Sequence, residues 1–123
     1  MLTPLLVVSF LALTPAVAHA PSCPSWEPMI RKAGLPVSEF SQIMWLESRC
    51  DPAAVGHNVN ARDDIGLLQV SASWSTLTKQ TCNTRKRPET ALLSPACNLK
   101  VAKRLFSISG FEPWKSTHKK EKK

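Results

Sequence analysis

Four cysteines restrict how this chain can fold more than any other feature: Cys23, Cys50, Cys82 and Cys97. The chain has 123 residues, and an even number of cysteines in so short a chain is typical of an exported domain held by disulfides. No two of them form a CxxC pair, so their spacing does not indicate a structural zinc site. We expect neither a metal nor a cofactor.

The four cysteines permit three pairings into two disulfides. Of these we favour Cys82 with Cys97 and Cys23 with Cys50, because the first pair closes a polar segment with few helix-forming residues. Two such bonds would help to stabilise the modest core that a chain of this length can build.

The first twenty residues, MLTPLLVVSFLALTPAVAHA, contain no Asp, Glu, Lys or Arg. They end in Ala18-His19-Ala20, a small-x-small pattern that fits a signal-peptidase site. We therefore expect residues 1–20 to be an export signal, with an uncleaved membrane anchor as the alternative. The mature protein would be secreted or periplasmic, and it would contact a membrane only through an uncleaved signal.

The charged residues all follow this segment, and their balance is strongly basic. The chain has 16 Lys and Arg against 9 Asp and Glu, a formal net charge of +7. Such a charge favours polyanionic partners such as nucleic acid, an anionic membrane or a bacterial wall polymer. No nucleic-acid-binding motif accompanies it, so nucleic acid is not an expected partner. We interpret residues 85–87 as a solvated loop and residues 115–123 as a basic C-terminal tail.

The remaining sequence, residues 21–114, predicts one mainly helical domain of the α+β class. Helical periodicity is clearest over residues 37–48 and 95–109. In the second of these, Leu99, Ala102, Leu105, Phe106 and Ile108 form a broad apolar side, and Gly110 follows as a stop signal.

Shorter elements are predicted on both sides of these helices. Ser25 can cap a short helix that runs to residue 33, and residues 88–93 favour another. Residues 51–64 are rich in Asn, Asp and Gly, which predicts a loop or a small hairpin.

An acidic residue occupies the apolar stripe of the helix predicted at residues 37–48. Phe40, Ile43, Met44 and Glu47 follow the i, i+3, i+4, i+7 rule, so all four share one face. A carboxylic acid can deliver a proton near neutral pH only when its surroundings favour the neutral form, and apolar side chains do so. The position of Glu47 therefore leaves two interpretations open, a solvated residue at a helix end or a general acid.

A second motif follows in DDIGLLQVSASW, Asp63 to Trp74. With the Leu-Glu-Ser of residues 46–48, it resembles the lysozyme-like superfamily, in which Glu-Ser at a helix end precedes a Gly-[Leu/Ile]-[Leu/Met]-Gln motif. The nearer resemblance is to animal-type (chicken-type) lysozymes and related phage enzymes, with Ile65 in place of their usual Tyr. Residues 98–99 and 110–114 are similar to segments of soluble lytic transglycosylases.

This resemblance implies a small lysozyme-like enzyme that cleaves the β-1,4 bond between N-acetylmuramic acid and N-acetylglucosamine in peptidoglycan. It implies that Glu47 is the general acid and Asp64 the second carboxylate, which stabilises an oxocarbenium ion or forms a covalent adduct. Gln69 and Trp74 would bind substrate, and Asn58 is a weaker candidate in the loop facing the cleft. Such an enzyme would act as a monomer.

Alternatives remain open at this point. Gln69 could instead satisfy backbone groups in the cleft wall, and Trp74 could belong to the core. The activity could be that of a lytic transglycosylase, which leaves 1,6-anhydromuramic ends, or the fold could serve a wall-binding protein without catalysis.

Overall fold

The computed structural model of this chain describes residues 2–9, 11 and 20–121. Half of the predicted export signal, residues 1, 10 and 12–19, lies outside these residues; residues 2–9 and 11 have no regular secondary structure and are exposed. Among the described helices, none has the length and apolar character needed to cross a bilayer.

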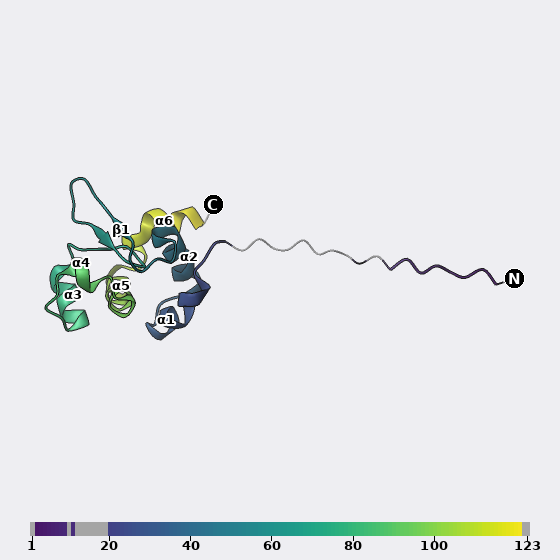
Figure 1. The fold of residues 1–123 in the computed structure, drawn as a ribbon, viewed down its shortest axis with the longest axis horizontal. Coiled ribbons are helices and arrows are strands. Elements are labelled where there is room, and N and C mark those ends of the chain that lie inside the picture. The colour runs from purple at the N-terminus through teal and green to yellow at the C-terminus, as the bar shows by residue number, and fades with distance from the viewer. Residues whose placement is uncertain (1, 10, 12–19, 122–123) are drawn as a thin grey trace.

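The folded part combines helices with a small sheet (Figure 1), as predicted for the α+β class. The helical elements, in chain order, are η1 (Pro24–Trp26), α1 (Glu27–Lys32), α2 (Val37–Ser48), α3 (Ser75–Cys82), α4 (Pro88–Ala91), α5 (Pro95–Ser109), η2 (Glu112–Trp114) and α6 (Lys115–Glu121). The strands are β1 (Val55–Gly56), β2 (Asp64–Ile65) and β3 (Val70–Ser71).

The three strands form an antiparallel sheet in the order β1-β2-β3. Gly56 pairs with Asp64 in the first ladder, and Asp64 pairs with Ser71 in the second. The hairpin alternative for residues 51–64 is therefore confirmed, whereas β3 was not predicted. This topology places Asp64 on the central strand.

The two longest helices, α2 and α5, have the bounds that their periodicity predicted. Their buried residues include Phe40, Ile43 and Met44 in α2 and Leu99 and Leu105 in α5.

Aromatic rings join these helices to the segment that follows α5. The ring of Phe40 lies 5.4 Å from that of Phe106 and 5.0 Å from that of Trp114, both edge-on. One assignment to the apolar side of α5 was wrong: Ile108 is 71% exposed, because the helix extends past the core in its last turn.

Three other details differ from the prediction. Ser25 does not cap a helix; it lies inside η1, and α1 begins after Trp26 with no side-chain cap. Helix α3 was not predicted, because its sequence, STLTKQTC, offers Leu77 as its single large aliphatic residue. The short helix α4 ends at Ala91, slightly earlier than expected.

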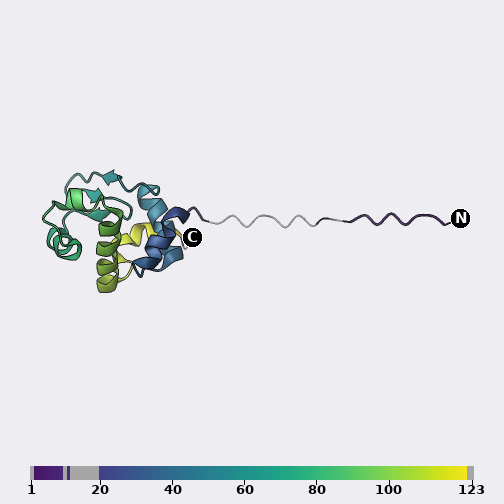
Figure 2. The same cartoon turned by 60° about the horizontal axis from the view of Figure 1, so that its bottom comes forward.

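The C-terminal segment is the largest departure. Residues 115–121 form helix α6 rather than a free tail, and α6 packs against α2 (Figures 1 and 2). On α6, Thr117 is buried and the imidazole of His118 stacks on the ring of Phe111, with centroids 4.0 Å apart. The expected boundary after Trp114 therefore does not mark the end of the packed structure.

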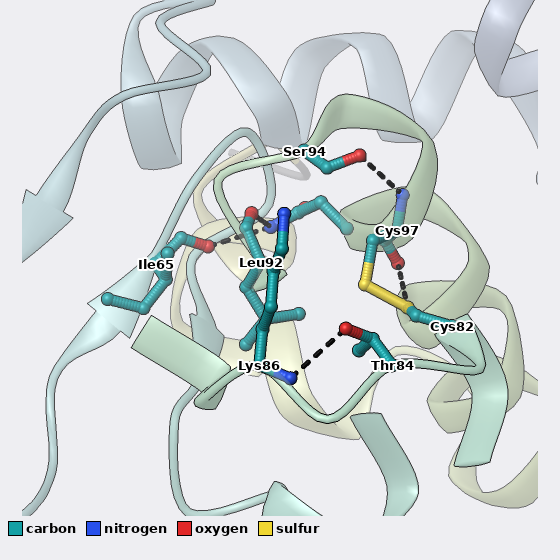
Figure 3. The surroundings of a disulfide bond; sticks show 8 residues. Ile65, Cys82, Thr84, Lys86, Leu92, Ser94 and Cys97 are labelled. Atoms are coloured by element: carbon teal, nitrogen blue, oxygen red, sulfur yellow. Dashed lines mark hydrogen bonds between the residues drawn. A yellow bond between two sulfur atoms is a disulfide. The ribbon is translucent and has the colours of Figure 1, made fainter. Parts of the chain in front are cut away.

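Both favoured disulfides are present. Cys23–Cys50 joins the start of η1 to the turn after α2, and Cys82–Cys97 joins the end of α3 to the first turn of α5 (Figure 3). Figure 3 also shows the cap of α5, where the hydroxyl of Ser94 accepts a hydrogen bond from the backbone N–H of Cys97 at 3.3 Å.

Candidate active site

A cleft of about 370 Å³ lies where the C-terminal end of α2, the sheet, the end of α5 and η2 meet. Carboxylates, hydroxyls and aromatic rings converge on it. The lining side chains are Glu47, Asp64, Gln69, Val70, Ser71, Trp74, Leu105, Ser109, Glu112, Pro113, Trp114 and Ser116. A cavity of about 500 Å³ between α1, α3 and α5 is larger, but the described residues that line it include no carboxylate.

Glu47 reaches the cleft from the last turn of α2. It is partly exposed, whereas Met44, one turn earlier on the same face, is fully buried. The apolar stripe of α2 thus ends at the cleft wall and places the carboxyl group at the boundary between core and solvent. Ser48 is buried and donates its hydroxyl hydrogen to the carbonyl of Met44 at 3.0 Å, within its own helix.

The chain turns sharply directly after Glu47 and Ser48. Arg49 and Cys50 both adopt positive φ angles, 55° and 65°, which are uncommon for residues other than glycine. The disulfide to Cys23 and the stacking of the Arg49 guanidinium on Trp45, 3.6 Å from the ring centroid, hold this turn.

The carboxyl group of Glu47 contacts a residue from the segment predicted to be a tail. Thr117 Oγ1 lies 2.9 Å from Glu47 Oε1 and also 2.9 Å from the carbonyl oxygen of Trp114. Sequence reasoning missed Thr117, because nothing in a polar, lysine-rich segment signals that one hydroxyl is buried.

Asp64 faces the same cleft from the central strand. Its Oδ2 accepts a hydrogen bond at 3.1 Å from Asn58 Nδ2, which also donates to the carbonyl of Arg62 at 3.0 Å. Asn58 itself lies in the loop beside Asp64 and not among the described residues that line the cleft. Asn58 therefore contacts the second candidate carboxylate, and its predicted contact with sugar remains a prediction.

The loop that joins β1 to β2 carries Asn58 and is tied to α4. Arg62 forms an ion pair with Glu89, and His57 Nδ1 lies 3.1 Å from Asp63 Oδ1. The hydrogen bond from Arg62 lowers the pKa of Glu89 below its usual value, and the positive charge of Arg87 acts in the same direction.

The Gly-Leu-Leu-Gln motif leads into the cleft wall at Gln69, and the side chain of Asn98 holds the buried part of the motif. Leu67 and Leu68 are fully buried. Asn98 Oδ1 accepts from the N–H of Leu68 at 3.0 Å, and its Nδ2 donates to the carbonyls of Ile65 and Leu92 at 2.8 and 2.9 Å. Figure 3 shows these two carbonyls pointing toward the same amide.

Trp114 holds the other side of the same peptide segment. Its indole N–H donates to the carbonyl of Leu68 at 2.9 Å, and the residue is 2% exposed. The sequence resemblance had singled out Asn98 and Trp114 without assigning them a role. Their hydrogen bonds to the backbone of Leu68 give both residues a structural role.

Gln69 both lines the cleft and satisfies backbone groups. Its Nε2 donates to the carbonyls of Ala54 and Gly66 at 3.2 and 3.1 Å, and its backbone has a φ of 48°. These contacts match the alternative interpretation; substrate binding by its side chain remains a prediction.

Trp74 lines the cleft and is 44% exposed, so it does not belong to the core. An exposed indole at a cleft wall offers an apolar face on which a sugar ring could stack. Three serines and Glu112 also line the cleft, and sequence reasoning had not proposed them as site residues; the serines are Ser71, Ser109 and Ser116. Glu112 is paired with Lys115 at 3.1 Å.

No group of three or more His, Cys, Asp or Glu side chains that could hold a metal ion was found among the residues that the structure describes. Glu47 on α2 and Asp64 on β2 are two carboxylates on different elements that line one cleft.

A helix that ends in Glu-Ser and the Gly-Leu-Leu-Gln segment that follows it carry the resemblance to the lysozyme-like superfamily, and in the structure Glu47 and Gln69 line one cleft. The chain belongs to the family described as the transglycosylase SLT domain, whose model matches residues 25–110. This family acts on peptidoglycan, so the chain is a peptidoglycan-cleaving enzyme of the lysozyme-like superfamily. Searches of curated proteins and of solved structures gave no match.

Proposed function

We propose that this enzyme is a muramidase, which hydrolyses the β-1,4 bond between N-acetylmuramic acid and N-acetylglucosamine. The observation that carries this proposal is that Glu47 and Asp64 line the same cleft from α2 and β2. Glycosidases commonly use a pair of carboxyl groups that flank the scissile bond.

In the proposed mechanism, Glu47 donates its proton to the glycosidic oxygen as the bond to the anomeric carbon breaks. The carboxylate of Asp64 stabilises the positive charge that develops on the sugar ring. Its position supports this role, since it accepts a hydrogen bond from Asn58 at the polar edge of the cleft. Water then adds to the anomeric carbon and gives one proton back to Glu47.

The substrate fits the character of the cleft and the surface. Trp74 offers a stacking face, and the serine hydroxyls offer hydrogen-bond partners for sugar hydroxyls and acetamido groups. A net charge of +7 attracts the enzyme to a wall that carries anionic polymers. Two disulfides and a peptidoglycan substrate are consistent with a protein that works outside the cytoplasm.

Lytic transglycosylation is the second candidate, and the family match favours it. In that reaction an intramolecular hydroxyl of the muramic sugar replaces water, and the product is a 1,6-anhydro end. The general acid is still required, whereas the second carboxylate loses its chemical role.

Mass spectrometry of digested peptidoglycan separates the two reactions, because a hydrolysed end is one water heavier than an anhydro end. We expect hydrolysed ends from the wild-type enzyme. Predominantly anhydro ends would overturn the muramidase proposal and establish the second candidate. No cleavage of walls in a turbidity assay would instead indicate a binding protein.

An Asp64→Asn variant gives an independent test. Hydrolysis that depends on this carboxylate should slow by about 100-fold or more. A lytic transglycosylase would keep most of its activity in the same variant. Circular dichroism and thermal melting check that the exposed hairpin has not unfolded.

A further inference from the structure

Thr117 has one hydroxyl hydrogen and two oxygen neighbours at equal distance. Its Oγ1 lies 2.9 Å from both Glu47 Oε1 and the carbonyl oxygen of Trp114. One hydrogen can be donated to only one of these two oxygens at a time. When that hydrogen goes to the carbonyl of Trp114, Oγ1 can form a hydrogen bond with Glu47 only by accepting a proton that Glu47 carries.

Two hydrogen-bond arrangements satisfy this geometry. When Glu47 is ionised, Thr117 donates to its carboxylate, which is a charge-assisted hydrogen bond. When Glu47 carries a proton on Oε1, it can donate to Thr117, whose own hydrogen then goes to the carbonyl of Trp114. The second arrangement is ordinary for a helical Thr, whose hydroxyl often donates to the carbonyl three residues earlier.

We propose that Thr117 is a positioning residue that holds the carboxyl group of Glu47 in both protonation states. This inference rests on the proposed role of Glu47 as the acid. A general acid must bind its proton, deliver it and recover it within one cycle, and each state has different hydrogen-bond needs. A carbonyl or an amide N–H beside Oε1 would match one state alone, whereas a hydroxyl matches both.

The packing of α6 fixes the hydroxyl at this place. Thr117 is 8% exposed, and the neighbouring His118 is stacked on Phe111 at 4.0 Å. The resulting contact spans seventy positions of the chain and lies beyond residue 110, where the family match ends.

The charged groups around this contact come from several elements. Asp64 lies on β2 and Glu112 on η2, and both line the cleft with Glu47. Lys115, on α6, is paired with Glu112, and Arg49 follows Glu47 at the end of α2. His118, also on α6, is stacked on a ring. Thr117→Val keeps all of these side chains and removes only the hydroxyl beside Glu47, and Thr117→Ser restores that hydroxyl.

The test compares Thr117→Val with Thr117→Ser in wall-lysis kinetics between pH 4 and 9. Valine keeps the shape and removes the hydroxyl; serine keeps the hydroxyl. For valine we expect kcat to fall about 10-fold, with KM within about twofold, because the acid loses its orientation while substrate contacts remain. The alkaline limb of its pH profile should move to higher pH, since the hydroxyl no longer stabilises the carboxylate. Thr117→Ser should have the kcat and the alkaline limb of the wild-type enzyme.

A valine variant with wild-type kcat and an unchanged alkaline limb would overturn the inference. A loss in valine that serine does not restore, in variants that melt like the wild type, would assign Thr117 to packing and would overturn it as well. Glu47→Gln is the control for the underlying proposal. If Glu47→Gln stays active, the assignment of the acid has failed; if it is inactive and Thr117→Val is normal, only the present inference has failed.

Discussion

A Cβ atom added to Gly66 would stand 2.5 Å from Nδ2 of Asn98, the amide that binds the backbone of Ile65 and Leu68. The same atom would lie 2.5 Å from the carbonyl oxygen of Leu92, and Gly66 has a φ of 77°. Glycine at this position is thus required both by backbone conformation and by the close approach of Asn98.

Gly66→Ala should destabilise the protein by about 3 kcal/mol, because left-handed strain adds to a clash with a buried amide and a backbone oxygen. Gly34→Ala is the matched control. Gly34 has a φ of 78°, but an added Cβ would meet only the flexible end of Lys103 at 3.6 Å. Gly34→Ala should therefore lower the free energy of unfolding by only about 1 kcal/mol. Urea denaturation measures both, and equal costs would contradict the packing described for Gly66.

Glu47→Gln should reduce wall lysis by about 100-fold or more without loss of stability, because the amide keeps the shape and cannot supply the proton. The control is Glu112→Gln. Glu112 lines the same cleft but is exposed and paired with Lys115, so its variant should stay within about threefold of the wild type. If the two variants lost activity equally, the cleft carboxylates would have to be reassigned.

Trp74→Ala should raise KM by about 5- to 10-fold and leave kcat within about twofold, since stacking contributes to binding both before and during the reaction. Trp74→Phe should give an intermediate KM. The residue is 44% exposed, so the melting temperature should change little. An unchanged KM on soluble wall fragments would show that sugars bind elsewhere in the cleft.

The Arg62–Glu89 pair should make stability depend on pH at the acidic end. Because the pKa of Glu89 is lowered in the folded protein, its contribution is present above the usual Glu range and is lost as the pH falls through the folded value. The difference in urea midpoint between wild type and Glu89→Gln should therefore shrink from pH 7 to pH 3. A difference that persists at pH 3 would argue against this pair as its source.

The two disulfides should differ in what their loss does to activity. Replacing Cys82 and Cys97 with Ala should lower stability by about 3 kcal/mol, as expected for a loop of this length. Replacing Cys23 and Cys50 should lower stability by about 3.5 kcal/mol and also slow lysis, because Cys50 holds the turn that follows Glu47. Equal specific activities of the two folded variants would refute the second effect.

The sequence predicted best those helices in which apolar residues recur with helical spacing, because the same residues are the ones buried in the core. In α2, Phe40 and Met44 recur on one face because that face packs on the core, so the residue that interrupts it, Glu47, could be recognised. The bounds of helix α5 were predicted equally well from its apolar periodicity. The disulfide pairing followed from the polar character of the segment between Cys82 and Cys97.

The parts that could not be predicted depend on contacts between distant segments. Helix α6 begins KSTHKK, which has no apolar stripe; it is positioned by Thr117 and His118 against residues that precede it in the chain. The sequence placed Asn58 in the loop before Asp64 but did not predict its hydrogen bond to Asp64. That contact depends on the register of β1 and β2.

The peptide groups of Leu68 are held from both sides, by Asn98 at its N–H and by Trp114 at its carbonyl. The amide hydrogen of Leu68, which is buried and hydrogen-bonded to Asn98, should therefore be among the slowest to exchange with solvent. The loop between β1 and β2 is anchored by exposed ion pairs, so it can open locally at small cost. Amide hydrogens in the β1–β2 loop should therefore exchange much faster than those of the segment around Leu68.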